Sequence, residues 1–496
     1  MSSENNSLKQ IMVHRLEKLG KMKNAGINPF PYRYSASHRI NRILSEQENL
    51  LEECVSICGR IISFRKMGKA SFIHIQDESS KLQAYAKNDI LPDGVYDNIV
   101  RNLDLGDIIG ISGKLFITKM GELTIKADTL EILSKNIRPL PNLKEKDGEA
   151  FNSFEDKELR YRHRHLDLIA NPDVINVFKD RARIISALRA ELDAQEYIEV
   201  ETPVLQTIYG GASARPFTTF HNTLDQKLYL RIADELYLKR LIIGGFTKVY
   251  EIAKNFRNEG MDRNHNPEFT ALEFYQAYAD VYDMMNLTED LIHKVAEKIG
   301  RKNLIFLSNT IDISQPFVRK SMFDLLNEAT GERVDYMDTP KLYELANSKC
   351  IKVEKNMNYG QLLDGIFGAL VEPNLVKPTF VTDYPKAISP LAKVSRDGNT
   401  EIVERFELFI GGMEFANSFT ELNDPIEQRN RLEAQSKLRD LGDDEAQIID
   451  EEFLQAMETG MPPTGGVGIG IDRLVMLLTE QSSIKDVLLF PAMRPE

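Results

Sequence analysis

The stretch Phe256-Arg-Asn-Glu-Gly260, followed by His265-Asn-Pro-Glu-Phe-Thr-Ala-Leu-Glu273, contains two strand-like runs on either side of a polar loop. Alternate residues of a strand share a face, so Arg257 lies with Glu259, and Phe269 lies with an acid and a tyrosine. A surface ion-pair ladder would also place charges together, but it would not need the His-Asn-Pro loop. We therefore expect an antiparallel hairpin that carries a binding site.

A second hairpin is expected around Gly411-Gly412, a two-residue turn between strand-like runs. This turn makes Glu407 and Glu414 diagonal neighbours, and two carboxylates placed in this way repel unless a cation lies between them. Mg²⁺ is the simplest such cation, because it is commonly held by one or two carboxylates and nucleotide phosphates. The alternative is that one carboxylate points to solvent past a bulge. Asn417 and Glu421 fall on the opposite parity, so the strand must bend or end before them.

The C-terminal run Gly465-Gly-Val-Gly-Ile-Gly-Ile-Asp-Arg473 contains three alternating glycines, which leave one face of a strand without side chains. Something flat can then lie against the backbone. We expect Asp472 to cap the following helix and Arg473 to offer a cation to a polyphosphate in its first turn. Close packing of a helix on the strand is the alternative explanation.

The fold class expected for the larger part of the chain is α+β. Its strand-like runs come in adjacent pairs with helical segments between them, which favours an antiparallel sheet flanked by helices over a βαβ series. Residues 54–135 contain five short alternating runs at intervals of about ten residues. This pattern is typical of a five-stranded OB-fold barrel, whose open face commonly binds single-stranded nucleic acid.

Four segments follow from these patterns: an N-terminal helical extension (1–50), the barrel (51–140), a linker or hinge (141–172) and the α+β domain (173–496). The basic run Arg160–His165 in the linker fits a solvated turn and a phosphate contact about equally well. A long helix is expected over residues 173–196.

Composition sets limits on location and partners. The 496 residues contain only three cysteines (Cys54, Cys58 and Cys350), too few for a disulfide framework and poorly spaced for zinc. No apolar run reaches the roughly 20 residues of a membrane span, and the N-terminus lacks the apolar core of a signal peptide. We therefore expect a cytoplasmic protein without a membrane partner. The net charge of −13 divides into +3 for residues 1–150 and −16 for the rest.

These motifs resemble those of class II aminoacyl-tRNA synthetases. The run Glu199–Leu205, the segment 256–273 and the segment 466–473 resemble motifs 1, 2 and 3 of that class, in the required order. The preceding barrel, the runs at 160–168 and 210–217, and Glu414–Pro425 resemble the bacterial lysyl-tRNA synthetase family. The resemblance extends from about residue 10 to the C-terminal Phe-Pro-Ala-Met-Arg-Pro.

The resemblance implies ATP-dependent activation of L-lysine and its transfer to the 3′ end of lysine tRNA, with Mg²⁺ as the cofactor. Arg257 and Arg473 match the family's catalytic arginines, at the α-phosphate and at the far end of ATP. The implied ATP-binding residues are Arg257, Glu259, His265, Asn266, Phe269, Glu414 and Arg473, and the implied metal ligands are Glu407 and Glu414. Motif 1 implies a homodimer, although Ile184, Ile185 and Leu188 also fit plain core packing.

The implied lysine-binding residues are Gly211, Glu235, Arg257, Glu273, Tyr275, Asn417 and Glu421. Three acids among them, with no arginine dedicated to a substrate side chain, favour lysine over aspartate or asparagine. The implied anticodon-binding residues are Phe72, Gln83 and Glu122. For Phe72 alone, a place in the barrel core is the ordinary alternative, because Ile73 and Ile75 compete for the inside.

Two other functions fit part of the sequence. An enzyme that lysylates a protein side chain would use the same core, but such relatives look like the catalytic domain without the barrel. A tRNA-binding or regulatory protein with an inactive core is disfavoured by the intact arginines and carboxylates.

Overall fold

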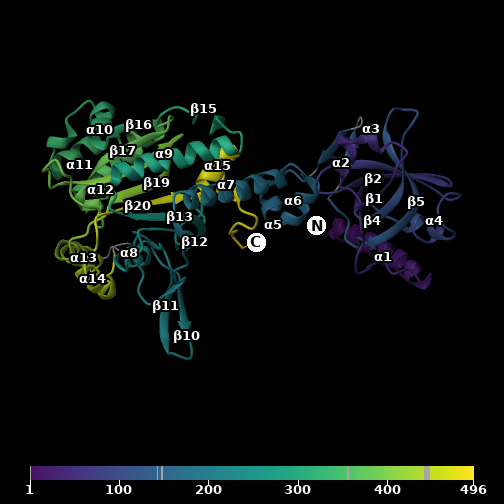
Figure 1. Cartoon of the computed structure of the whole chain (residues 1–496), viewed down its shortest axis with the longest axis horizontal. Helices are drawn as coiled ribbons and strands as arrows, with labels where there is room; N and C mark the ends of the chain where they lie inside the picture. Colours follow the sequence, from purple (N-terminus) through teal and green to yellow (C-terminus); the bar gives the residue numbers. More distant parts are fainter. Residues whose placement is uncertain are drawn as a thin grey trace. The chain divides into compact units, whose positions relative to one another are not determined.

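The structure is a computed structural model. It describes residues 2–141, 143–146, 149–152, 154–354, 357–440 and 447–495. The chain divides into two compact units, Met1–Asp173 and Val174–Glu496, and each is described by itself (Figure 1). Some residues of the expected linker (142, 147, 148 and 153) lie outside the described ones.

A closed barrel with the strand order β1-β2-β3-β5-β4 forms the centre of the first unit. Its strands alternate between buried and exposed side chains, and Ile57, Ile73, Ile75, Ile109 and Ile111 are fully buried inside it. The five-stranded barrel expected from the sequence is therefore confirmed. The strands are β1 (Cys54–Met67), β2 (Ala70–Gln76), β3 (Lys81–Lys87), β4 (Ile108–Ile117) and β5 (Leu123–Ser134).

One long helix and several short ones accompany the barrel. The long helix, α1, covers Ser2–Asn24, within the helical extension expected over residues 1–50. Its Met22 is fully buried in the barrel core. The others are α2 (Ile40–Ser45), α3 (Gln47–Leu50), α4 (Val95–Asn98) and η1 (Val100–Asn102).

Two helices occupy much of the segment expected to be a linker. After the paired strands β6 (Leu143–Lys146) and β7 (Glu149–Asn152) come α5 (Lys157–Arg162) and α6 (Arg164–Ala170). The basic run 160–165 lies on these helices, and its arginines pair with acids: Arg160 and Arg164 with Asp167, and Arg162 with Glu158. Arg164 is buried. The run is thus neither a turn nor an unpaired basic patch.

An eight-stranded sheet forms the centre of the second unit, in the order β16-β17-β18-β19-β20-β13-β12-β8. Its pairs are antiparallel except at the two edges, where β8 lies parallel to β12 and β16 parallel to β17. This confirms the predicted α+β class. The strands are β8 (Ile198–Glu199), β12 (Lys248–Phe256), β13 (Glu268–Ala277), β16 (Val318–Ser321), β17 (Thr379–Pro385), β18 (Ile402–Ile410), β19 (Met413–Thr420) and β20 (Thr464–Gly470).

Helices α7 (Val174–Ala194), α9 (Val281–Lys298) and α15 (Ile471–Leu478) build the largest core with this sheet. Ile184 and Leu188 of α7 are fully buried in that core, so the packing explanation holds for both. A second core lies between the sheet and α10 (Met322–Thr330), α11 (Thr339–Ser348) and α12 (Tyr359–Leu370). The remaining helices are α8 (Glu235–Ile243), α13 (Pro425–Asp440), α14 (Glu451–Glu458), α16 (Ile484–Val487) and the short η2 (Val334–Tyr336), η3 (Glu372–Asn374) and η4 (Lys386–Ile388).

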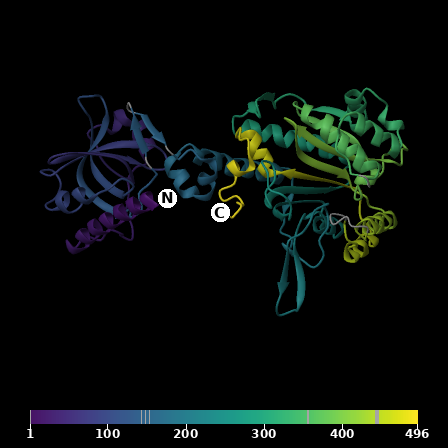
Figure 2. The same cartoon turned by 180° about the vertical axis from the view of Figure 1, so that it is seen from behind.

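Two small sheets complete the second unit. One contains β9 (Leu205–Gln206), β10 (Thr218–His221) and β11 (Gln226–Leu230), and the other contains β14 (Asn303–Phe306) and β15 (Asn309–Asp312). The β10–β11 hairpin extends away from the body of its unit in both views (Figure 1 and Figure 2). In the described part of the chain, no helix is both long and apolar enough to cross a bilayer.

Candidate functional site

A cavity of about 520 Å³ opens beside the central strands of the second unit. The strands β12, β13, β18, β19 and β20 contribute to its lining, together with α8, α15 and the loop before β13. Every site residue predicted for the second unit lines it: Gly211, Glu235, Arg257, Glu259, His265, Asn266, Phe269, Glu273, Tyr275, Glu407, Glu414, Asn417, Glu421 and Arg473.

The three alternating glycines of β20 form part of the cavity lining, as the sequence pattern suggested. A Cβ atom on Gly466 would lie 2.2 Å from Oε1 of Glu421 and 2.3 Å from Cε1 of Tyr275. On Gly468 the nearest atom would be Cγ of Glu273, at an ordinary 3.7 Å. The space left by the missing glycine side chains is therefore partly filled by neighbouring acidic and aromatic groups, and the rest is open to a ligand.

Asp472 does not cap the following helix, contrary to the expectation. Gly470 is the N-cap of α15, and no side chain caps that position. The buried Asp472 instead accepts a hydrogen bond from the Thr270 backbone N–H at 2.8 Å and pairs with Arg181 at 2.6 Å. Its carboxylate thus joins α15 to β13 and α7, because tertiary partners outcompete the local cap.

Arg473 lies in the first turn of α15, as predicted, and bridges two other site residues. Its guanidinium donates to the Glu414 backbone oxygen at 2.7 Å and lies 3.3 Å from the carboxylate of Glu414. A third contact of 3.1 Å joins it to Nε2 of His265, whose Nδ1 lies 2.9 Å from Asp262. Arginine and imidazole together offer several donors to an anion.

Arg257 follows β12, and its side chain stacks on Phe269. The centre of the guanidinium lies 5.0 Å from the ring centroid, within range of a cation–π contact. Its Nε atom is buried without a hydrogen-bond partner among the described residues. Burial lowers the pKa of Arg257, whereas the nearby Glu259 and Glu414 raise it. A desolvated cation with a free donor is suited to an incoming anion.

The loop between β12 and β13 holds the last two nucleotide candidates. Glu259 is exposed at the cavity rim. Asn266 is buried, and its amide donates to the Glu268 carbonyl at 2.6 Å and accepts from the Ala492 N–H at 3.1 Å. Both ends of the Asn266 amide are therefore already engaged with the protein backbone.

The hairpin at Gly411 and Gly412 has the expected turn, with positive φ angles of 62° and 75°. Phe409 pairs with Glu414, as predicted, but the register shifts immediately afterwards, so that Leu408 pairs with Ala416 and Glu407 with Asn417. The extra residue of this β-bulge changes the parity of β19. Asn417 therefore faces the same cavity as Glu414, which settles the parity conflict in the sequence.

Two residues outside the predicted site, Arg405 and Tyr384, hold the carboxylate of Glu407. Arg405 donates a short hydrogen bond to one carboxylate oxygen, and the Tyr384 hydroxyl donates to the other at 2.8 Å. Arg405 also donates to Asn417 at 3.2 Å and stacks on Tyr384. Burial raises the pKa of Glu407 to about 7, although Arg405 opposes this and Glu414 adds to it.

The surroundings of Glu407 and Glu414 suit a hard cation shared with a ligand. Both offer oxygen ligands, and burial raises the pKa of nearby Asp364, with a further contribution from Glu414. Among the described residues, no group of three or more His, Cys, Asp or Glu side chains could hold a metal ion by itself. Such a pair fits Mg²⁺ that takes its other ligands from phosphates and water.

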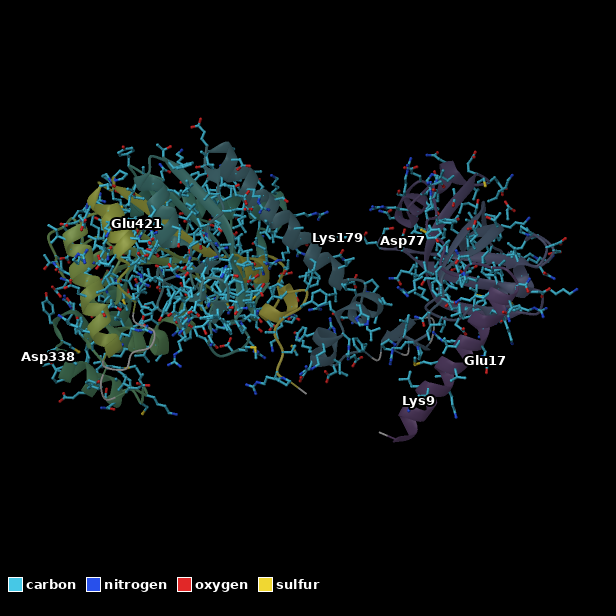
Figure 3. The ribbon with its side chains drawn as sticks, turned by 90° about the horizontal axis from the view of Figure 1, so that it is seen from below. Lys9, Glu17, Asp77, Lys179, Asp338 and Glu421 are labelled. Atoms are coloured by element: carbon cyan, nitrogen blue, oxygen red, sulfur yellow. The ribbon has the colours of Figure 1, made fainter. Side chains whose placement is uncertain are left out.

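Glu235 and Glu421 form an acidic pocket with a lysine between them. Lys239 is fully buried, and its Nζ lies 2.5 Å from Oε1 of Glu235 and 2.5 Å from Oε2 of Glu421. Oε1 of Glu421 has no hydrogen-bond partner in the described structure. Figure 3 labels Glu421 among the side chains of the second unit.

A second group of acids lies beside this pocket. Tyr275 donates to Glu273 at 3.1 Å, and Asn255 donates to Asp234 at 3.3 Å. Burial raises the pKa of Glu273, and the charge of the neighbouring Asp234 raises it further. Gly211 lies close by, where a Cβ atom would come within 3.0 Å of Glu235.

The predicted anticodon residues lie together on one face of the barrel, where Glu122 is exposed and Gln83 is buried. Phe72 is half-buried on the face of β2 opposite the fully buried Ile73 and Ile75, so it does not belong to the barrel core. Its ring lies 4.9 Å from that of Tyr85 on the paired strand. Next to this pair, Gln83 donates a short hydrogen bond to Glu122, and His74 lies 2.8 Å from the same carboxylate.

Sequence reasoning missed several residues that line or support these sites. Lys239 had one visible signal, because it stands four residues after Glu235 on a helix. Tyr85 and His74 could have been found from their alternation with the core of β2 and β3. Arg405 and Tyr384 offered no local signal, since only the packing of β17 and β18 brings them together.

Comparisons with known proteins agree with this geometry. A family model described as tRNA synthetases class II (D, K and N) matches residues 156–494, and one described as an OB-fold nucleic acid binding domain matches residues 55–133. A lysine–tRNA ligase of Carboxydothermus hydrogenoformans is 49% identical over 99% of both chains. One from Porphyromonas gingivalis is 49% identical over 98% of this chain and 85% of its own. One from Moorella thermoacetica is 47% identical over 98% of both.

The class II model covers well over half of the chain, and the similarity to these relatives extends over nearly its full length. The order of barrel and antiparallel sheet and the convergence of the segments 256–273 and 466–473 on one cavity agree with it. The chain therefore belongs to the class II tRNA synthetases of the D, K and N group.

Proposed function

We propose that this protein is a lysine–tRNA ligase, which activates L-lysine with ATP and transfers the lysyl group to the 3′ end of lysine tRNA. The observation that carries the proposal is the pair of buried carboxylates, Glu235 and Glu421, at one end of the cavity. A lysine ammonium needs such acids, whereas the side chain of aspartate needs cations. Relatives named lysine–tRNA ligase agree with this choice.

In the first reaction, a carboxylate oxygen of lysine attacks the α-phosphorus of ATP, and the bond from that phosphorus to the bridging oxygen of pyrophosphate breaks. The nucleophile is already ionised, so no protein base is required. Catalysis then depends on positioning and on neutralising charge at the phosphorus. Arg257, with its unpartnered buried Nε, would contact both the attacking carboxylate and the α-phosphate.

The rest of the cavity would bind the nucleotide. Phe269 would stack on adenine, and the guanidinium of Arg257 would remain stacked on the Phe269 ring. Arg473 and His265, joined to each other at 3.1 Å, would hold the terminal phosphates. Glu259 and Asn266 would lie near the base and sugar. The amide of Asn266 is engaged at both ends, so its part would be to shape the loop rather than to bond directly.

Glu407 and Glu414 would hold Mg²⁺, and Glu414 would also contact ATP. A bound Mg²⁺ would offset the charge of the phosphate oxygens. The chain's own contribution is to hold the two carboxylates: Tyr384 and Arg405 orient Glu407, and Arg473 contacts Glu414. These contacts keep both side chains at the cavity wall before the nucleotide binds.

Selectivity for lysine would depend on the acid end of the pocket. Glu421 and Glu235 would meet the side-chain ammonium, with Tyr275 and Asn417 beside them, while Glu273 and Gly211 would lie near the α-amino group. An uncharged rival would leave a buried carboxylate without a partner, at a cost of about 1–3 kcal/mol or more.

The barrel would read the anticodon of lysine tRNA. Phe72 would supply a half-buried aromatic ring and Glu122 an exposed carboxylate. The buried Gln83 donates to Glu122 and accepts from Thr124, so its part would be to hold Glu122 in place. Single-stranded bases bind such surfaces by stacking and by hydrogen bonds at their edges. Tyr85, which lies against Phe72, would extend this stacking surface.

The edge of the large sheet would form the interface of a homodimer. The edge strand β8 has only one neighbour in the sheet, and Ile198 on it is half exposed. Exposed apolar residues next to an edge strand favour a partner there. A cytoplasmic location remains a prediction from the sequence.

Lysine-dependent exchange of pyrophosphate into ATP tests the proposed function in the full-length protein. We expect strong exchange with lysine and Mg²⁺, and weak exchange with aspartate or asparagine. Exchange supported by aspartate but not by lysine would contradict the pocket assignment. Charging of lysine tRNA, measured separately, tests the second reaction.

A further inference from the structure

The acid pocket contains a lysine of the protein itself. Lys239 lies one helical turn after Glu235 on α8, and its ammonium contacts Glu235 and Glu421 at the same distance of 2.5 Å. The Lys239 side chain is 1% exposed and that of Glu421 is 0% exposed. The ammonium of Lys239 therefore occupies the space between the two acids before any substrate binds.

The charges of these three residues do not balance. With both carboxylates ionised they carry −2 and the ammonium carries +1, which leaves −1 at this end of the cavity. A buried charge is costly unless it is paired, so the remaining charge needs a cation. Oε1 of Glu421 is buried without a hydrogen-bond partner among the described residues. It also lies beside the glycine face of β20 that lines the cavity, 2.2 Å from where a Cβ of Gly466 would be.

We propose that Lys239 is a resident counter-ion, which fixes Glu235 and Glu421 in place, opposes protonation of Glu421 and leaves one negative charge for the side-chain ammonium of the substrate. Lys239 is thus a positioning and specificity-determining residue. This inference rests on the proposed lysine activity, and it adds a residue that acts through the two acids.

The proton balance of the pocket supports this role. Burial raises the pKa of Glu421, and the ammonium of Lys239 is the strongest influence that lowers it. Without Lys239, one of two adjacent buried carboxyl groups would take up a proton. Lysine would then have to displace that proton in order to bind, and its affinity would depend on pH.

A purely structural role for Lys239 makes a different prediction. In that case the lysine only joins α8 to the end of β19, and its loss lowers stability without changing how lysine binding depends on pH. The two roles therefore predict different pH profiles for the KM of lysine. They also predict different effects of combining K239M with E235Q.

The first experiment measures the KM for lysine against pH in pyrophosphate exchange, with wild type and K239M. We expect the KM to rise in K239M at neutral pH and to recover toward alkaline pH, changing by up to about tenfold per pH unit. The KM for ATP should change much less. K239R, which keeps the charge, should follow the wild-type profile. A K239M profile parallel to that of wild type would overturn the proposal.

A matched control replaces another lysine of the same unit, one that is partly buried. Lys248 donates to the Gln195 backbone oxygen at 2.9 Å and does not line the cavity. K248M should keep the wild-type pH profile of the lysine KM, whatever its effect on thermal stability. A profile altered in K248M as in K239M would trace the effect to general destabilisation and overturn the proposal.

The second experiment holds even if K239M does not fold. E235Q leaves one ammonium and one carboxylate, with no net charge for the substrate, so lysine should bind weakly. E235Q/K239M restores a net charge of −1, so the double variant should bind lysine more tightly than E235Q. Equal or weaker binding by the double variant would overturn the role of Lys239. Absence of lysine-dependent exchange in wild type would instead overturn the proposed function.

Discussion

Asn417 lies directly opposite Glu407 in the β18–β19 ladder, although Glu414 lies opposite Phe409 only two residues further along β18. Three residues of β19 thus correspond to two of β18, and the bulge at this point directs Glu414 and Asn417 to the same cavity. The metal-binding and lysine-binding ends of the proposed site are therefore parts of one hairpin.

Arg405 links these two ends, which leads to the first prediction. It donates to Asn417 at 3.2 Å and also to Glu407, so R405K keeps the charge but cannot make both contacts in the same geometry. We expect both the KM for lysine and the half-saturating Mg²⁺ concentration to rise, each by about tenfold, since a hydrogen bond to a charged group contributes roughly 1.5–3 kcal/mol. Pyrophosphate exchange at varied lysine and Mg²⁺ measures both.

The control for this substitution is R319K, at an arginine of the same unit that lies outside the cavity and contacts Asn286. It should leave both constants at wild-type values. If only one constant rises in R405K, Arg405 does not connect the two ends.

The second prediction concerns the pH dependence of the Mg²⁺ requirement. Burial raises the pKa of Glu407 to about 7, so this carboxyl is ionised above that pH and gains a proton below it. A proton and Mg²⁺ then compete for the same oxygens. As the pH falls below about 7, the half-saturating Mg²⁺ concentration should rise by up to about tenfold per pH unit. A requirement that stays constant between slightly acid and slightly alkaline pH would contradict this assignment.

The sequence could predict most elements of this site but not all of their contacts. The glycine face of β20 and the hairpin turn follow from spacing alone, because alternation and turn chemistry are local. The bulge at β19 was visible only as a conflict of parity. The position of the bulge depends on which side chains pack into the core beside the sheet. Two consecutive residues, Phe415 and Ala416, are both buried there.

Contacts between distant segments were the hardest to predict. Asp472 has the spacing of a helix cap, yet Arg181 on α7 and the backbone of Thr270 on β13 take its carboxylate. Arg160 and Arg164 read as an open basic run, yet both pair with Asp167 once the segment folds into helices. A tertiary partner decides the role of Asp472, and a single sequence does not contain that information. Arg160 and Arg164 instead pair with an acid seven and three residues further along the chain, a spacing that the sequence does contain.

A third prediction uses two glycines on one face of β20. In G466A the new methyl group would lie 2.2 Å from Glu421 and 2.3 Å from Tyr275, so these side chains must move. We expect a large rise in the KM for lysine and a lower melting temperature. G468A meets its nearest atom at 3.7 Å, so it should keep the wild-type melting temperature and affect lysine less. Equal effects of the two substitutions would place the lysine pocket elsewhere.

The fourth prediction concerns Arg257, whose buried Nε has no hydrogen-bond partner among the described residues. R257A should lower the rate of pyrophosphate exchange at saturating substrates by about 10²–10³-fold, as is typical when one donor to a developing charge is removed. R257K should recover only part of this rate, because an ammonium cannot contact two anions as a planar guanidinium does. A change in the KM for ATP without a loss of rate would mean that Arg257 only binds the ground state.

The fifth prediction separates the barrel from the catalytic unit. Phe72 contacts Tyr85 at a ring distance of 4.9 Å and is half-buried. Stacking contributes about 1–3 kcal/mol per base, so F72A should raise the KM for lysine tRNA by about 5- to 150-fold while lysine-dependent pyrophosphate exchange stays at the wild-type rate. Phe30, which is exposed outside the barrel strands, provides the matched control F30A. That variant should charge tRNA normally. Loss of both exchange and charging in F72A, with a lower melting temperature, would mean that the ring stabilises the fold rather than binding the anticodon.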